Sequence, residues 1–79
     1  MDAQAVIGRL NRIYGADKGF RIYAVVMPGI LKDFRRMLET AAPGETVREE
    51  YRLEDGKAAI FLTGRRNTAG EAEIEAEVR

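Results

Sequence analysis

The chain has 79 residues with 13 acidic and 13 basic side chains, and it contains no Cys and no His. This length supports one domain, residues 1–79, with a small core. Ser is absent as well, so disulfides, thiolate or imidazole metal ligands and the usual Ser–His or Cys–His nucleophiles are excluded. We therefore expect a non-enzymatic protein with no metal and no cofactor.

The charge is unevenly distributed, although the formal net charge is zero. Residues 1–44 carry seven Lys and Arg against four Asp and Glu, and residues 45–79 carry six against nine, so the two parts have charges of +3 and −3. Ordinary surface scatter is the simplest explanation. The longest apolar stretch, residues 22–31, is interrupted by Pro28 and Gly29 and is too short to cross a bilayer. We expect a cytoplasmic protein without membrane contact.

The first predicted element is a helix over residues 3–14. Asp2 suits the N-cap position, and Gly15 suits the residue after the helix. Between them the apolar residues recur at helical spacing: Val6, Ile7, Leu10, Ile13 and Tyr14.

Residues 17–19 then suggest a turn, and residues 20–27 suggest a strand. Apolar side chains occupy both alternating sets of positions in this segment, and β-branched and aromatic residues dominate it. Such a pattern is typical of an interior strand that is covered on two sides.

A second helix is predicted from Pro28 in its first turn to Ala41, with Pro43 and Gly44 ending it. The remaining 35 residues predict three strands. The first runs from Val47 to Glu54, with Arg48, Glu50, Arg52 and Glu54 on its outward face. Asp55-Gly56 is a strong hairpin signal before a second strand over residues 57–63. A loop over residues 64–70 precedes the last strand, residues 71–78.

Together these elements predict an α+β fold in the order α-β-α-β-β-β. It would be a two-layer sandwich with a four-stranded mixed sheet and two helices on one face. The strand order is either sequential or a split βαβ arrangement with a parallel crossover.

Phe61 is the main candidate for a binding surface. If Ile60 and Leu62 face the helices, Phe61 lies on the other side of the sheet, where an apolar patch suggests a partner. The alternative is a third layer, with one helix on each face. The predicted partner-binding residues are Tyr23, Val25, Met27, Ala59 and Phe61.

Basic residues form a second candidate surface, because those on the two helices would merge if the helices packed side by side. The Arg65-Arg66 loop between glycines adds donors that suit a phosphate. The predicted nucleic-acid contacts are Arg9, Arg12, Lys32, Arg35, Arg36, Arg65 and Arg66. The simpler explanation is a solvated helix face.

The last strand carries a ladder of four glutamates at alternate positions, Glu71, Glu73, Glu75 and Glu77. A hard cation would need more converging oxygens than one strand provides, so the ladder is better explained as a soluble edge. Three classes of function stay open: a protein-binding module, a nucleic-acid accessory protein and an enzyme. We expect the first, self-associating as a homodimer through the sheet face or an edge strand.

Overall fold

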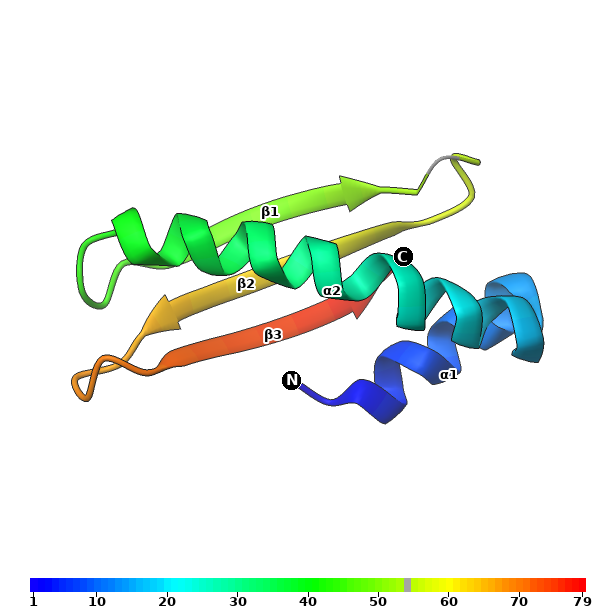
Figure 1. Ribbon diagram of the computed structural model, residues 1–79, viewed down its shortest axis with the longest axis horizontal. Coiled ribbons are helices and arrows are strands. Elements are labelled where there is room, and N and C mark those ends of the chain that lie inside the picture. Colours follow the sequence, from blue (N-terminus) through cyan, green and yellow to red (C-terminus); the bar gives the residue numbers. More distant parts are fainter. Residues whose placement is uncertain (54) are drawn as a thin grey trace.

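The computed structural model of the chain describes residues 1–53 and 55–79 (Figure 1). In this described part, two helices precede three strands. The elements are α1 (Ala3–Tyr14), α2 (Ala16–Thr40), β1 (Val47–Arg52), β2 (Ala59–Arg66) and β3 (Ala72–Val78). The strands form one antiparallel sheet in the order β1-β2-β3.

The α+β class predicted from the sequence is therefore confirmed, but the predicted architecture is wrong. The sheet in the described residues has three strands, not four, and all of its pairings are antiparallel. The parallel crossover, the split βαβ arrangement and the sequential four-stranded order are all overturned. The observed order is α-α-β-β-β.

The first helix has the predicted boundaries. The Asp2 side chain accepts a hydrogen bond from the Ala5 N–H at 3.3 Å, which satisfies one of the free donors of the first turn. Val6 and Leu10 on its apolar stripe are buried.

A single residue, Gly15, joins α1 to α2. Its φ of 91° and ψ of 155° lie in a region that is essentially restricted to glycine. The helices then approach very closely, because Gly19 on α2 faces the backbone of α1. A Cβ at Gly19 would lie 2.6 Å from the Asn11 nitrogen and 2.7 Å from the Leu10 carbonyl carbon. Glycine at both positions therefore produces a tight helical hairpin.

The predicted strand over residues 20–27 is instead the first half of α2. One stripe runs along the helix at spacings of three or four residues: Gly19, Met27, Ile30, Phe34 and Leu38 are buried, and Tyr23 is partly buried. The stretch from residue 22 to residue 31 has no charged side chain. Its apolar residues therefore fit the alternating pattern of a strand and the one-sided stripe of a helix equally well. Pro28 is exposed within the helix, four residues after the exposed Ala24. Proline has no backbone N–H, so the carbonyl of Ala24 loses its usual helical hydrogen-bond donor. Because Ala24 is exposed, water can donate to this carbonyl instead.

The sheet has one covered and one uncovered face. The α2 helix crosses the covered face, and α1 packs beside the end of β3 (Figure 1). Buried residues from both helices, β2 and β3 form one core, against which partly buried residues of β1 pack. The largest fully buried side chains are Phe34, Leu10, Met27, Leu38, Ile60 and Leu62. The predicted loop began too early, because β2 extends through Gly64 and Arg65 to Arg66. Glu54, predicted on the outward face of the first strand, lies outside the described residues.

Candidate functional site

The uncovered face of the sheet, here called the outer face, carries Phe61 at its centre. Ile60 and Leu62 on either side of it are fully buried beneath the helices, whereas Phe61 is only half-buried. Its neighbours across the ladder are Glu50 on β1 and Glu77 on β3. The placement of Phe61 opposite the helices agrees with the sequence prediction.

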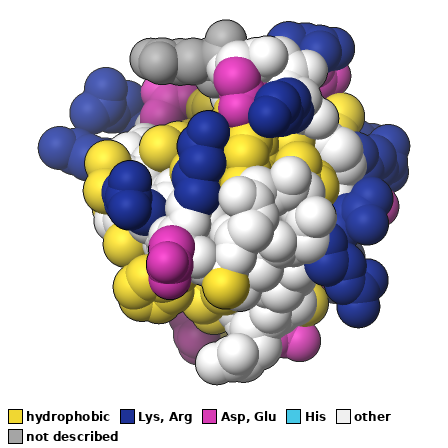
Figure 2. Space-filling model, turned by 90° about the vertical axis from the view of Figure 1, so that its right-hand side faces the viewer, with side chains coloured by type: hydrophobic (Ala, Val, Ile, Leu, Met, Phe, Trp, Pro, Cys, Tyr) yellow, Lys and Arg dark blue, Asp and Glu magenta, His cyan; other side chains and the backbone are white. Residues whose placement is uncertain are grey.

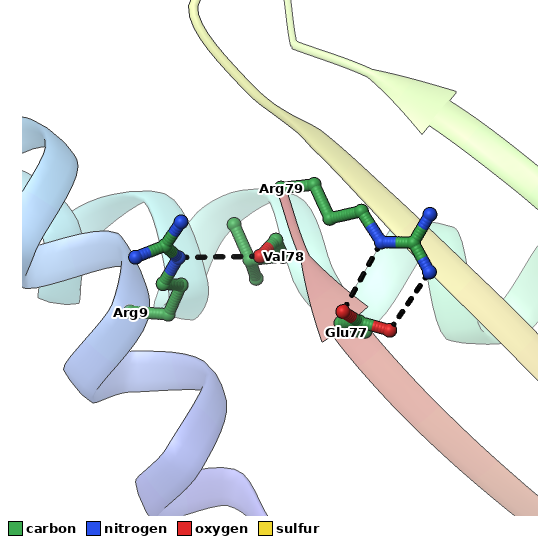
Figure 3. A network of polar contacts seen from close by, with 4 residues as sticks. All are labelled: Arg9, Glu77, Val78 and Arg79. Atoms are coloured by element: carbon green, nitrogen blue, oxygen red, sulfur yellow. Dashed lines mark hydrogen bonds and ion pairs between the residues drawn. The ribbon is translucent and has the colours of Figure 1, made fainter.

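The side chain of Arg79, the residue after β3, lies over the Phe61 ring. The Arg79 guanidinium lies 4.7 Å from the ring centroid, a cation–π distance. Figure 3 shows that this guanidinium also faces Glu77, to which Nε and Nη2 both donate at 3.1 Å. This bidentate bond lowers the pKa of Glu77. In the same view, Arg9 of α1 donates from Nε to the Val78 carbonyl at 3.4 Å.

Charged side chains surround Phe61 on the outer face. Arg52 pairs with Glu50 at 3.2 Å and Arg65 with Glu73 at 3.5 Å, and all four side chains are well exposed. An open hollow of about 710 Å³ lies over this face, with Arg48, Phe61, Thr63 and Glu75 among its lining residues. The outer face is therefore a charged surface with a single aromatic ring, not a continuous apolar patch.

The five predicted partner-binding residues do not share one face. Ala59 and Phe61 are on β2, but Tyr23, Val25 and Met27 belong to α2. Met27 is buried in the core, whereas Val25 is 72% exposed on the solvent side of the helix. The predicted patch assumed a strand over residues 20–27. Because that segment is helical, Tyr23, Val25 and Met27 do not belong to the patch.

Two apolar residues on α2 are exposed: Phe20, which sequence reasoning missed, and Val25, which it placed in the partner-binding patch. Phe20 is 58% and Val25 is 72% exposed. Figure 2 shows the end of the molecule that holds the helical hairpin, where hydrophobic side chains reach the surface among many Lys and Arg side chains. A helical assignment would have found Phe20, because this residue lies outside the buried stripe of α2.

The basic residues of the helices fall into two groups. Arg9 and Arg12 are on α1, which has 12 residues and turns back at Gly15 along the first half of the 25-residue α2. Lys32, Arg35 and Arg36 are on the second half of α2, which extends beyond α1 (Figure 1). The basic residues of α1 therefore lie beside the first half of α2, apart from the basic residues of its second half.

Arg65 and Arg66 point to opposite faces of β2. Arg65 lies on the outer face with Glu73, whereas Arg66 turns toward the helices and donates from Nη2 to the Ala41 carbonyl. Ala41 is the C-cap of α2, so Arg66 places a positive charge at the negative end of the helix dipole. Only Arg65 of this pair faces solvent on the outer side.

The loop after β2 uses its own side chain to satisfy its backbone. Asn67 Oδ1 accepts hydrogen bonds from the Ala69 and Glu71 N–H groups at 2.9 and 3.0 Å. These two donors are therefore already occupied, which weakens the case for a phosphate cradle at this loop.

Two tyrosine–aspartate hydrogen bonds join the helices to the sheet. Tyr51 on β1 donates to Asp33 on α2 at 2.7 Å, and Tyr14 on α1 donates to Asp55 in the β1–β2 turn at 2.9 Å. Partial burial, and then the bond to Asp55, raise the pKa of Tyr14 to about 12. Partial burial and the bond to Asp33 also raise the pKa of Tyr51. Both bonds connect layers of the fold, and neither lies at the outer face.

Among residues 1–53 and 55–79, no three Asp or Glu side chains converge as a metal site requires. Glu73 and Glu77 of the predicted ladder instead pair with Arg65 and Arg79. No helix in the same residues is both long enough and apolar enough to cross a membrane. No protein-family model, curated protein or solved structure matches the chain.

Proposed function

We propose that this chain is a small, non-enzymatic protein-binding module that self-associates through the outer face of its sheet. The observation that carries the proposal is the position of Phe61, a half-buried aromatic ring at the centre of a sheet face that the chain's own helices leave uncovered. Antiparallel sheets with one solvated face usually carry polar side chains there, so a central phenylalanine is a feature to explain.

The surrounding charges favour a protein surface over other partners. Arginines and glutamates both surround Phe61 on the outer face. Three arginine–glutamate ion pairs form there within the chain. A polyanion would favour a face of one sign, whereas a protein interface has an aromatic centre and a mixed polar rim. The predicted nucleic-acid interface stays a prediction, which a gel shift at low salt tests.

Light scattering over a range of concentrations tests the proposal. The wild-type mass should rise from that of one chain, 8.8 kDa, toward that of two chains. Phe61→Ser should keep the single-chain mass at every concentration, because it removes the central apolar contact. Val25→Ser is the matched control, since it removes an exposed apolar side chain from α2, and it should associate like the wild type.

Circular dichroism of both variants verifies that they are folded. A wild-type chain that keeps its single-chain mass at all concentrations would refute self-association. Association of Phe61→Ser equal to that of the wild type would show that the contact lies elsewhere on the molecule.

A further inference from the structure

The sheet has two edges, and α1 protects only the one that β3 forms. There, α1 packs beside the end of β3, and Arg9 Nε donates to the Val78 carbonyl at 3.4 Å. At the opposite edge, β1 has β2 as its single neighbour in the sheet of the described residues (Figure 1). The strand β1 is therefore the open edge.

The backbone of β1 presents a row of hydrogen-bonding groups at this open edge. The Leu53 N–H donates to the carbonyl of Ala58, the residue before β2, at 3.0 Å. Because bonded positions alternate along an antiparallel strand, Arg48, Glu50 and Arg52 direct their N–H and C=O groups away from β2. These positions span about 14 Å at the usual rise of a strand. Such a row is a template for one more strand.

A hollow lies between α2 and the end of β1. Its volume is about 400 Å³, and it is lined by Ile22 and Val26 of α2 and by Leu53, the residue after β1. All three side chains are half-buried, so they form an apolar floor beside the open edge. Alternate side chains of an added strand would face the helices, and the one beside Leu53 would reach this hollow.

Cationic side chains surround the open edge. Arg48 and Arg52 are exposed on the outer side of β1, and Lys18 of α2 lines the hollow. Asp55 also lines the hollow, but its carboxylate already accepts hydrogen bonds from the Tyr14 hydroxyl at 2.9 Å and from a backbone N–H of the turn at 3.0 Å. An incoming segment with an aliphatic side chain and carboxylates would therefore complement this edge.

We propose that β1 accepts an extended segment of a partner protein as a fourth, antiparallel strand. An aliphatic side chain of the segment enters the hollow beside Leu53, and acidic side chains lie opposite Arg52 and Arg48. A basic side chain opposite Glu50 completes the pattern. In strand addition of this kind, main-chain hydrogen bonds provide affinity and alternate side chains provide specificity. The site is at the edge of the sheet, so this inference goes beyond the proposed association through the outer face.

The charges of β1 make the edge selective. A short edge strand with charged side chains is protected against pairing with arbitrary strands. Its outer side carries Arg48, Glu50 and Arg52 in alternation with the other face. A segment with the opposite order of charges gains three favourable cross-strand pairs, whereas a segment with the same order meets three like charges. The partner is therefore selected by its charge pattern.

A synthetic peptide with this pattern tests the site. In fluorescein-labelled Ile-Glu-Val-Lys-Thr-Glu, the isoleucine lies beside Leu53 and the three charged residues lie opposite Arg52, Glu50 and Arg48 in that order. Fluorescence anisotropy should show saturable binding that weakens with added salt. The reversed peptide Ile-Lys-Val-Glu-Thr-Lys should bind about tenfold more weakly, because each of its charges meets a like charge.

The backbone bonds can be tested separately from the side chains. In the bound peptide, the N–H of the lysine points toward β1, whereas the N–H of the preceding valine points away from it. N-methylation of the lysine should weaken binding about tenfold, because it removes one hydrogen bond and places a methyl group between the strands. N-methylation of the valine is the matched control and should leave binding unchanged.

A charge swap tests the register. Arg48→Glu should weaken binding of the first peptide about fivefold, and replacing the final glutamate of the peptide by lysine should restore it. This recovery also shows that the variant folds. Arg35→Glu is the control and should bind like the wild type. Arg35 is exposed and lies about 200° around α2 from Asp33, which accepts the hydrogen bond from Tyr51 of β1.

The outcomes separate this site from the outer face. Phe61→Ser should bind the first peptide like the wild type, so a chain that never self-associates can still bind it. Absence of binding would overturn the proposal, and so would equally tight binding of the reversed or the lysine-methylated peptide. A dimer that Arg48→Glu dissociates, together with no binding of the first peptide, would place a second copy at this edge and overturn the proposal as well.

Discussion

Phe34 of α2 packs directly onto Gly64 of β2. A Cβ on Gly64 would lie 2.7 Å from Phe34 Cε2 and 3.3 Å from Leu38 Cδ1. The aromatic ring thus occupies the space that the missing side chain leaves, and both residues are buried. Gly64 sits within a strand, where glycine is usually unfavourable, so its place is explained by this close helix–sheet contact.

Gly64→Ala should destabilise the fold. The Phe34 ring would have to move away from the sheet, and overpacking of this kind costs about 1–3 kcal/mol in the free energy of unfolding. Urea denaturation measures this change. Gly29→Ala is the control, because Gly29 is an exposed helical glycine with open space around it. That substitution should raise stability by about 0.5–1 kcal/mol. Equal effects of the two substitutions would contradict the packing argument.

Local signals in the sequence predicted several elements correctly. The Asp2 cap and the apolar spacing gave the boundaries of α1, and the Asp55-Gly56 turn separated β1 from β2. The alternation of side chains along a strand also predicted that Phe61 lies on the sheet face opposite to the one that Ile60 and Leu62 share.

The segment from residue 20 to residue 27 could not be assigned from its own pattern. Its apolar residues fit a strand with two covered faces and a helix with one buried stripe equally well. In the structure the segment is helical, and Gly19 just before it lies against the backbone of α1 at Asn11, a contact between two helices that the pattern of residues 20–27 does not reveal. The same error had placed Tyr23, Val25 and Met27 in the predicted binding patch, although all three belong to α2. The hydrogen bond from Arg66 to the Ala41 carbonyl at the end of α2 could not be predicted from a local pattern either, because the two residues are 25 positions apart.

Gly19→Ala should be more damaging than alanine at the open helical positions Gly8 and Gly29. The new methyl group would overlap the backbone of α1 at Leu10 and Asn11, so the helices would have to separate. We expect a loss of about 1–3 kcal/mol or more in the free energy of unfolding. Gly8→Ala in α1 is the matched control, since nothing lies within 4 Å of its added Cβ.

The backbone origin of this clash can be tested with a second substitution. Asn11→Ala shortens the nearest side chain but leaves the Asn11 nitrogen and the Leu10 carbonyl carbon in place. The double variant should therefore remain about as unstable as Gly19→Ala. Full rescue by Asn11→Ala would show that only a side chain was in the way.

Arg65 and Arg66 should differ in their effect on stability although they are adjacent. Arg66→Met removes the bond to the Ala41 carbonyl at the end of α2, and hydrogen bonds of charged groups contribute about 1.5–3 kcal/mol. Arg65→Met removes only an exposed ion pair with Glu73, which contributes about 0–1 kcal/mol. Thermal denaturation compares the two. A larger loss for Arg65→Met would contradict a capping role for Arg66.

Burial of Tyr14 and its hydrogen bond to Asp55 should make stability depend on pH at both extremes. The pKa of Tyr14 is raised from 10.0 to about 12, so its contribution is complete below pH 10 and is lost as the pH rises toward 12. The backbone bond from Lys57, and to a smaller extent the bond from Tyr14, lower the pKa of Asp55 below 3.8. Its contribution is therefore present above that pH and is lost as the pH falls through the folded-state value.

Asp55→Asn tests this link between the helical hairpin and the β1–β2 turn. Removal of the negative charge should lower the pKa of Tyr14 from about 12 toward 10.0, because ionisation of the phenol would no longer place two negative charges together. Ultraviolet absorbance of the phenolate follows the titration, and Tyr14→Phe identifies which transition belongs to Tyr14. Asp17→Asn, at an exposed position in the first turn of α2, is the control and should leave the titration unchanged. An unchanged Tyr14 titration in Asp55→Asn would mean that burial alone raises its pKa and that the bond between the two segments contributes nothing to it.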